Sequence, residues 1–211
     1  ASALATLNEL SDGRAMAGLS VGHSALRNIG QLPTPIAELS DYDGTVRRLL
    51  AGKTTRFESG TDGALGWLGQ PARVPLHIAA TGPRLTRAAA GMADGVILLR
   101  GSAPDLIESG INLIDQGLVD AGRAAGSVQI TAWIYVGLDR DTERAHDQVR
   151  ARVAAVLRMT EPSLFEGQNR EAVARLHREY DMFAHADTIP PHAHLVPDNL
   201  ISRYAVAGTP D

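Results

Sequence analysis

Hydrophobic and polar positions along the chain predict helices and strands in alternation. Four short, mostly non-alternating apolar runs are typical of parallel strands buried on both faces; they span 14–21, 74–80, 96–99 and 128–138. Apolar residues recurring every three or four positions predict helices between and beyond these runs; they span 1–10, 34–51, 84–93, 103–121, 141–159 and 170–183. Turn residues separate the elements closely, which favours right-handed strand–helix–strand crossovers and an α/β fold.

Two α/β folds compete for this pattern. A doubly wound sheet requires a glycine-rich dinucleotide fingerprint, and the run 18–22 (GLSVG) has the wrong spacing for it. A TIM barrel instead places polar or glycine-bearing residues after strand after strand. The segments 22–24 (GHS), 81–83 (TGP) and 100–101 (RG) fit that pattern. We therefore expect a TIM (β/α)8 barrel, and four strands are half of one.

Two segments interrupt the regular pattern. Residues 53–73 contain four glycines and Trp67, which predicts a rim insertion with a short hairpin that acts as a lid. Residues 184–197 contain three histidines and three prolines. With no helix to fix their spacing, the histidines favour a mobile loop over a metal site. On the strand 128–138, Trp133 and Tyr135 share one face, and we expect them to pack in the core.

The composition narrows the class of protein. The 211 residues are 44% hydrophobic, enough for the core of one globular domain. The net charge of −4 provides no positive field for a phosphate backbone, so nucleic acid is not an expected partner. No apolar run reaches the roughly 20 residues that cross a bilayer, so we expect no membrane contact. The chain has no cysteine, which excludes disulfides and agrees with a cytoplasmic enzyme.

Blocks spread along the chain resemble the luciferase-like monooxygenases. They are LNELSDGRAMAGLSVGHSALRNIG (7–30), TPIAELSDY (34–42), VPLHIAATGPRLTRAAAGMADGVIL (74–98) and VPDNLISRYAVAGTPD (196–211), in the order that the family has them. Only about 161–193 lies outside the resemblance. It implies a single barrel domain over 1–211, truncated at both ends, that holds about strands 4 to 7. The ATGP sequence at 80–83 is similar to the branch that uses the deazaflavin F420 and is described as methylenetetrahydromethanopterin-reductase-like.

The turn at 81–83 is the clearest candidate binding site. Free N–H groups and the dipole of a helix N-terminus attract an anion, and Thr81 adds a hydroxyl donor. The resemblance implies that a cofactor phosphate binds here, with Ala80, Thr81, Gly82, Pro83 and Arg84 as contacts. On the residues alone, the favoured alternatives are that Thr81 simply caps the helix and that Arg84 faces solvent.

The loop at 22–24 is the second candidate site. The resemblance places it beside the cofactor ring, with Gly22 and Ser24 as cofactor contacts. His23 lies where some F420 enzymes of the family carry an acidic proton donor. An imidazole with a pKa near 6.5 is suited to moving a proton at neutral pH, so His23 is the candidate catalytic residue, and an ordinary exposed loop histidine is the alternative.

Three functions follow from these expectations. The first is an F420-dependent oxidoreductase that transfers a hydride between deazaflavin and a small organic substrate. The second keeps the fold but uses FMN, as a luciferase-like monooxygenase. The third is a non-catalytic relative that binds a ligand or a partner chain. The resemblance also implies a homodimer, and no metal is expected.

Overall fold

The computed structural model describes residues 1–210. Its central feature is a parallel sheet of four strands in the order β1 (Ala17–Leu19), β4 (Leu76–Ala80), β5 (Gly95–Leu98) and β6 (Gln129–Ala132). Neighbouring strands of the sheet follow the order of the chain, with no reversal of direction along the sheet. A doubly wound sheet has such a reversal, whereas a barrel wall does not. The α/β fold with parallel strands is therefore confirmed.

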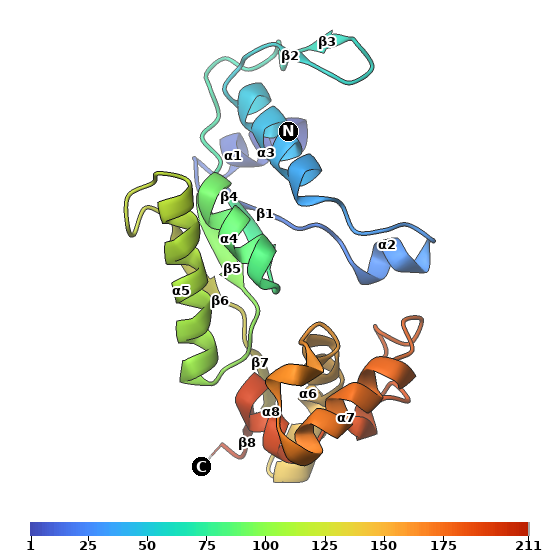
Figure 1. Ribbon diagram of the computed structural model, residues 1–211. Helices are drawn as coiled ribbons and strands as arrows, with labels where there is room; N and C mark the ends of the chain where they lie inside the picture. The colour runs from blue at the N-terminus through green and yellow to red at the C-terminus, as the bar shows by residue number, and fades with distance from the viewer. Residues whose placement is uncertain (211) are drawn as a thin grey trace.

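Helices cover the outer face of this sheet (Figure 1). Besides α1 (Ser2–Leu10) and the long α3 (Ile36–Leu50), they are α4 (Pro83–Met92) and α5 (Pro104–Asp120). Ile78 and Val96 are fully buried against Ala89 of α4 and Ile114 of α5. Burial of this apolar area is the main term that holds the layers together.

The two helices α4 and α5 approach each other unusually closely. A Cβ built on Gly117 of α5 would stand 2.2 Å from the carbonyl oxygen of Arg87 and 2.9 Å from Cβ of Ala90, both on α4. Across the same contact, a Cβ on Gly91 would stand 3.2 Å from Cβ of Ala121. Only residues without a side chain, or with a methyl group, allow two helices to pack at this distance.

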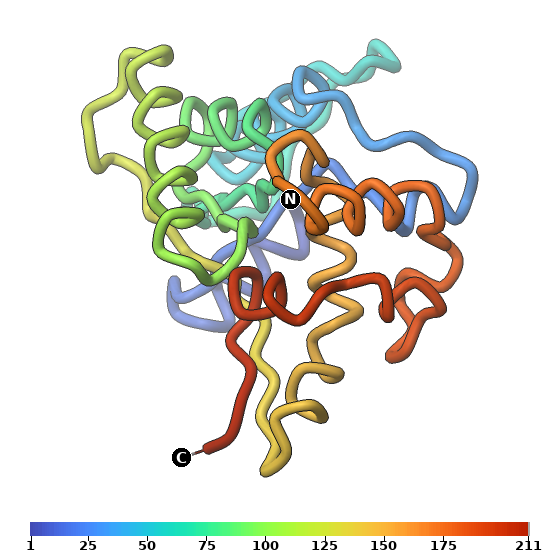
Figure 2. The backbone as a smooth tube through the Cα atoms, turned by 60° about the horizontal axis from the view of Figure 1, so that its bottom comes forward, coloured from blue at the N-terminus to red at the C-terminus, as the bar shows by residue number. Residues whose placement is uncertain are grey.

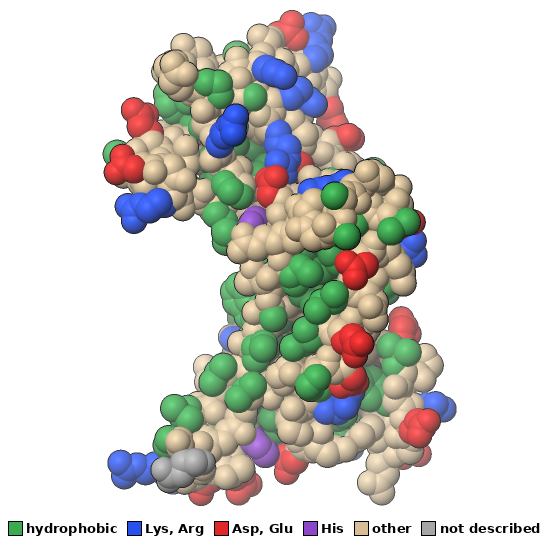
Figure 3. Space-filling view, turned by 90° about the vertical axis from the view of Figure 1, so that its left-hand side faces the viewer, with side chains coloured by type: hydrophobic (Ala, Val, Ile, Leu, Met, Phe, Trp, Pro, Cys, Tyr) green, Lys and Arg blue, Asp and Glu red, His purple; other side chains and the backbone are tan. Residues whose placement is uncertain are grey.

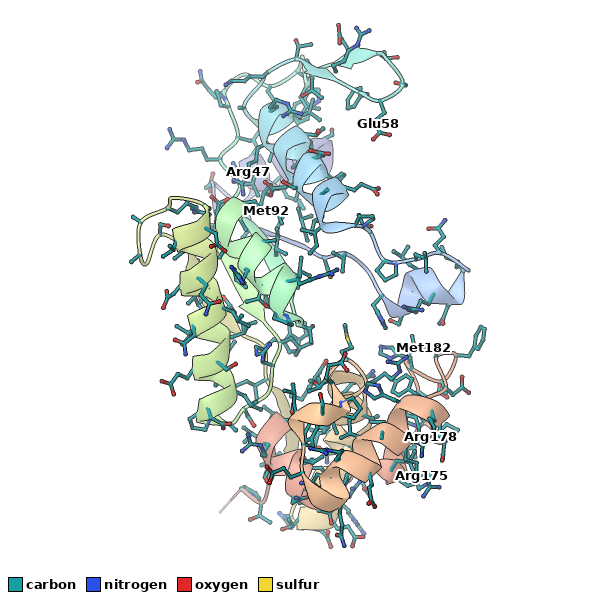
Figure 4. All side chains as sticks on the ribbon, viewed as in Figure 1. Arg47, Glu58, Met92, Arg175, Arg178 and Met182 are labelled. Carbon is teal, nitrogen blue, oxygen red and sulfur yellow. The ribbon has the colours of Figure 1, made fainter. Side chains whose placement is uncertain are left out.

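A buried carboxylate joins α3 to the sheet. Asp43 is 3% exposed and accepts a hydrogen bond of 2.7 Å from Nε of Arg47. The same guanidinium donates to Asp94, also at 2.7 Å, and Asp94 accepts a bond from the backbone N–H of Leu76. A further bond from Arg47 reaches the carbonyl of Met92, beside which it lies in Figure 4.

The fourth predicted strand is broken. Its first half is β6, and its second half, β7 (Tyr135–Leu138), forms a separate parallel ladder with β8 (Ala205–Gly208). The break lies at residues 133–134, where Trp133 still donates its N–H to the carbonyl of Leu98. Trp133 is 56% exposed, so the prediction that it packs in the core is wrong, whereas Tyr135 packs against a buried cluster.

A second group of helices packs on the β7–β8 ladder. It consists of α6 (Thr142–Leu157), α7 (Gly167–Glu179), α8 (Asp198–Tyr204) and the short 3-10 helices Pro162–Leu164 and Ala193–Leu195. Asp141 caps α6 by accepting bonds from the N–H groups of Glu143 and Arg144. Gly137 fits beneath α6, because a Cβ there would stand 2.2 Å from the carbonyl oxygen of Ala145. Figure 2 shows the loop between β1 and α3 reaching toward this group.

Two predicted irregular segments have defined structure. The segment 53–73 contains an antiparallel hairpin of β2 (Thr55–Arg56) and β3 (Asp62–Gly63), whereas its action as a lid stays a prediction. The segment 184–197 packs His192 at 2% exposure, and its mobility likewise stays a prediction. A short helix that the sequence pattern did not predict, α2 (Ser24–Asn28), follows β1.

Part of the outer surface is hydrophobic. Figure 3 views the side that carries α5 and shows hydrophobic side chains across the waist of the molecule. Several strand residues of the two ladders are more than a third exposed, namely Ile130, Val136, Leu138 and Val206. Among the residues that the structure describes, no helix combines the length and apolar character that a bilayer crossing requires.

Candidate active site

A cavity of about 1020 Å³ opens where the parallel strands end. One wall consists of the residues that follow β1, β4 and β5 at their carboxyl ends. The opposite wall comes from α6, the segments on either side of α7, and α8. Figure 1 shows these two groups of elements facing each other, with α2 at the mouth between them. A cavity at the carboxyl ends of parallel strands is the position at which barrel enzymes bind their ligands.

The N-terminus of α4 lies on the strand wall. Gly82 is the N-cap residue, and the first helical bond runs from the N–H of Thr86 to its carbonyl. Pro83 has no N–H, so the free donors of this end are the amides of Gly82, Arg84 and Leu85. No atom lies within 4 Å of the position that a Cβ on Gly82 would take, so a ligand has room to approach.

Thr81 does not cap this helix. The cap residue makes no side-chain hydrogen bond, and the backbone carbonyl of Thr81 instead accepts a bond of 3.2 Å from Arg100. The capping role that the sequence left open is therefore absent. Within the described residues, the Thr81 hydroxyl has no hydrogen-bond partner, and its residue lines the cavity beside Gly82.

Arg100 adds a positive charge to the same wall. It follows β5 with only Leu99 between them, and burial lowers the pKa of its guanidinium. Its Nη2 donates to Oγ of Ser109 at 3.4 Å, and its Nε is buried without a partner. Among residues 1–210 no carboxylate forms an ion pair with it. Sequence reasoning noted this position only as the end of a strand and missed the side chain as a candidate ligand.

His23 and Gly22 form the wall beside β1. Gly22 has a φ of +67°, a left-handed conformation that favours glycine, and a Cβ there would also have to displace the side chain of Leu26, whose Cδ1 would stand 2.7 Å away. His23 is half-buried at the start of α2 and lines the cavity. Burial lowers the pKa of His23, and the nearby cations Arg27 and Arg158 lower it further, together with His185.

The other predicted contacts occupy different positions. Pro83 and Arg84 line the cavity, with Arg84 exposed. Ala80 is 1% exposed and points from β4 toward the helices, so its side chain does not line the cavity. Ser24 begins α2 and is also not among the lining residues. The structure therefore brings the turn at 81–83 and His23 to one cavity, although nearly 60 residues separate them.

The opposite wall carries polar groups that sequence reasoning did not propose. Tyr180, at the end of α7, and His185 line the cavity together with Met182 and Arg158. Figure 4 shows Met182 at the end of this wall nearest α2, with Arg175 and Arg178 further along α7. The only signal in the sequence was the density of histidines after residue 184. Among the described residues, no three or more His, Asp and Glu side chains are grouped in a way suited to a metal ion.

Comparison with known proteins agrees with this geometry. The sequence profile of the luciferase-like monooxygenase family matches residues 1–211. A 5,10-methylenetetrahydromethanopterin reductase from Archaeoglobus fulgidus is 29% identical over 219 residues, which cover all of this chain and 65% of that protein. An F420-dependent glucose-6-phosphate dehydrogenase from Nakamurella multipartita is 29% identical over 171 residues, 75% of this chain and 49% of that protein.

A solved structure shows the same fold. The coenzyme F420-dependent tetrahydromethanopterin reductase from Methanopyrus kandleri superposes with a TM-score of 0.73 at 20% identity, over all of this chain and 66% of that one. The chain thus spans about two thirds of the length of these reductases. It matches part of the luciferase-like TIM barrel, which confirms the predicted fold class.

Proposed function

The chain belongs to the luciferase-like monooxygenase family, and from that premise we propose that it is part of an oxidoreductase that binds coenzyme F420 in the cavity described above. Its distant relatives include proteins named as F420-dependent. The observation that carries the proposal is an unpaired cation beside a free helix N-terminus. Arg100 and the first turn of α4 together present a concentration of donors that suits a phosphate.

The residues present fit such a cofactor. The buried Nε of Arg100 lacks a partner, and the open space above Gly82 admits an oxygen atom close to the backbone. The amides of Gly82, Arg84 and Leu85 and the hydroxyl of Thr81 would hold the phosphate. When bound, a deazaflavin accepts or supplies a hydride, which is chemistry that no side chain can provide.

The chain's own residues would position the substrate, keep water away from it and provide a group that accepts a proton. Gly22 fixes the loop that presents His23 to the cavity. Because its pKa is lowered, His23 is neutral at pH 7 and is suited to accepting a proton. Buried apolar side chains such as Phe165 and Leu200 on the opposite wall would shield an organic substrate from water. A small organic substrate is therefore the partner that we propose for this cavity.

The proposal is tested by titrating the protein with F420 and, separately, with FMN, while following fluorescence quenching. We expect F420 to bind and Arg100→Gln to weaken it roughly 10- to 150-fold, the value of one charge-assisted hydrogen bond. The double variant Thr81→Ala with Gly82→Val, which removes a donor and fills the open space, should also bind more weakly.

Arg87→Gln is the matched control. Arg87 is also on α4 and carries the same charge, but it pairs with Asp120 and does not line the cavity. Its F420 affinity should equal that of the unsubstituted protein. Preferred binding of FMN would make the monooxygenase the better assignment, and binding of neither cofactor would favour a non-catalytic role. Unchanged F420 affinity in both cavity variants would place the phosphate elsewhere.

A further inference from the structure

The wall opposite Arg100 carries a hydrogen-bonded tyrosine–histidine pair. The hydroxyl of Tyr180 lies 2.6 Å from Nδ1 of His185, and both residues line the cavity. Both belong to the part of the chain outside the sequence blocks that resemble the family. Neither has a role in the binding of the cofactor phosphate proposed above.

The pair is held firmly in place. The ring of Tyr180 stacks on that of His192, with centroids 3.9 Å apart and 28° between the planes. His192 is buried, and its Nδ1 accepts a bond of 3.3 Å from the N–H of Asp181. On the other side, the carbonyl of His185 accepts a bond of 3.3 Å from Arg152 of α6. A side-chain pair fixed by packing and hydrogen bonds in this way is pre-organised for a ligand.

The pair is uncharged at neutral pH. Burial raises the pKa of Tyr180 to about 12, and burial together with Arg152 lowers the pKa of His185. The tyrosine thus keeps its proton and the imidazole does not gain one. The charged and titratable groups that face the pair are Arg152 and Arg158 at α6, Tyr135 of β7, His23 across the cavity, and His192, which has Asp181 and Asp187 near it.

We propose that Tyr180 and His185 form the substrate-oxygen site of this cavity, and that they bind the hydroxyl group of an alcohol or the carbonyl group of the matching ketone and carry its proton. In the His185 tautomer that carries its proton on Nε2, Nδ1 accepts the proton of the Tyr180 hydroxyl, which leaves the phenol oxygen free to accept a bond from a substrate O–H. Apolar residues of the same wall, including Met159, Met182 and Leu200, surround the carbon skeleton.

The assignment rests on the proposed function, which supplies the redox partner. In alcohol oxidation, a bound deazaflavin would take up the hydride that carries the electron pair of the broken carbon–hydrogen bond. The substrate O–H proton passes to the oxygen of Tyr180, and the proton of Tyr180 passes to Nδ1 of His185. The alcohol has then lost two electrons and two hydrogens and become a ketone, and His185 is an imidazolium. Ketone reduction follows the same path in reverse.

The site is tested without any cofactor, with acetophenone carrying a ¹³C carbonyl as the probe. Infrared difference spectra record the carbonyl stretch of bound acetophenone between pH 8 and pH 5. At high pH the hydroxyl of Tyr180 donates to His185. As His185 gains a proton, its Nδ1–H donates to the phenol oxygen, and the hydroxyl turns to the probe. We expect the carbonyl band to move to lower frequency as the pH falls.

Two variants distinguish a bond from Tyr180 to the probe from a nonspecific effect of a polar cavity on the carbonyl band. Tyr180→Phe should bind acetophenone with no pH-dependent band. In His185→Leu the hydroxyl has no competing acceptor, so the band should be shifted at every pH. Tyr42→Phe, an exposed tyrosine of α3, is the matched control and should behave as the unsubstituted protein. A band that does not respond to pH in the unsubstituted protein, or a response that persists in Tyr180→Phe, overturns the assignment. F420 titration of the same proteins reports on the proposed function separately.

Discussion

The close contact between α4 and α5 predicts opposite effects for one substitution at two glycines. Alanine is favoured over glycine inside a helix by about 1 kcal/mol. At Gly44 in α3 the nearest atom to a new Cβ is Nη1 of Arg48 at 3.5 Å, which is ordinary contact with a flexible side chain. Gly44→Ala should therefore stabilise the protein by up to about 1 kcal/mol.

At Gly117 the same change meets the backbone. The new Cβ would stand 2.2 Å from the carbonyl oxygen of Arg87, which moves only if α4 moves. Because the new Cβ meets backbone, we expect a cost in the upper part of the overpacking range, about 2–3 kcal/mol, and the helix preference of about 1 kcal/mol reduces it to a net loss of about 1–2 kcal/mol. In a protein of this size, that corresponds to a lower Tm by roughly 2–8 °C.

Urea unfolding followed by circular dichroism measures both variants. Similar slopes with denaturant would show that the two substitutions act on the native state and leave the exposed surface of the unfolding transition unchanged. The test is whether the free energy of unfolding rises in Gly44→Ala and falls in Gly117→Ala. If Gly117→Ala is as stable as the unsubstituted protein, the helices are further apart than described and the close-packing argument is incorrect.

Three further outcomes are expected. Arg47→Met leaves the buried carboxylate of Asp43 unpaired, so its free energy of unfolding should fall by on the order of 3 kcal/mol, whereas Arg56→Met, which breaks an exposed pair with Asp62, should change it by less than about 1 kcal/mol in the same urea assay. Burial lowers the pKa of His192, so the contribution of its neutral form to stability is present above pH 6.5 and is lost as the pH falls. The Tm of His192→Asn should therefore decline less between pH 7 and pH 5 than the Tm of the unsubstituted protein. An equal decline in both proteins would contradict this. His23→Ala should reduce turnover more than F420 affinity, and equal turnover across pH would remove the proton role of His23.

Most of the regular elements could be predicted from the chain alone. The apolar runs at 74–80 and 96–99 became β4 and β5, and helical spacing located α3 to α6 within a few residues. The break after Ala132 could not be predicted, because β-branched and aromatic residues continue through it without a glycine or proline. The strand assignment of 205–208 was also missed, since its pairing with β7 is a long-range contact that no local pattern encodes.

The candidate site also contains residues that could be predicted from the sequence and residues that could not. The turn at 81–83 follows β4 and His23 lies in the loop that follows β1. Parallel strands bring their carboxyl ends together, so the meeting of these residues in one cavity followed from topology. Arg100 had the same positional signal, but its missing partner is visible only in three dimensions. Tyr180 lies near the end of the predicted helix 170–183 and His185 in the irregular segment after it, and their approach to 2.6 Å depends on how α7 packs.

The break at Trp133 and Ile134 has a consequence for ligand binding. The helix end at Gly82 follows a strand of the four-stranded sheet, whereas Tyr180 and His185 lie in the segment after α7, in the group of helices that packs on the β7–β8 ladder. The backbone joins the ladders directly at this break, and Ser102 adds a tether through its bonds to the carbonyls of Arg203 and Ala205. A molecule that touches both walls therefore acts as a further cross-link, so its affinity is linked to the rigidity of the junction. Substitutions at the junction should alter the affinity of ligands that they never contact.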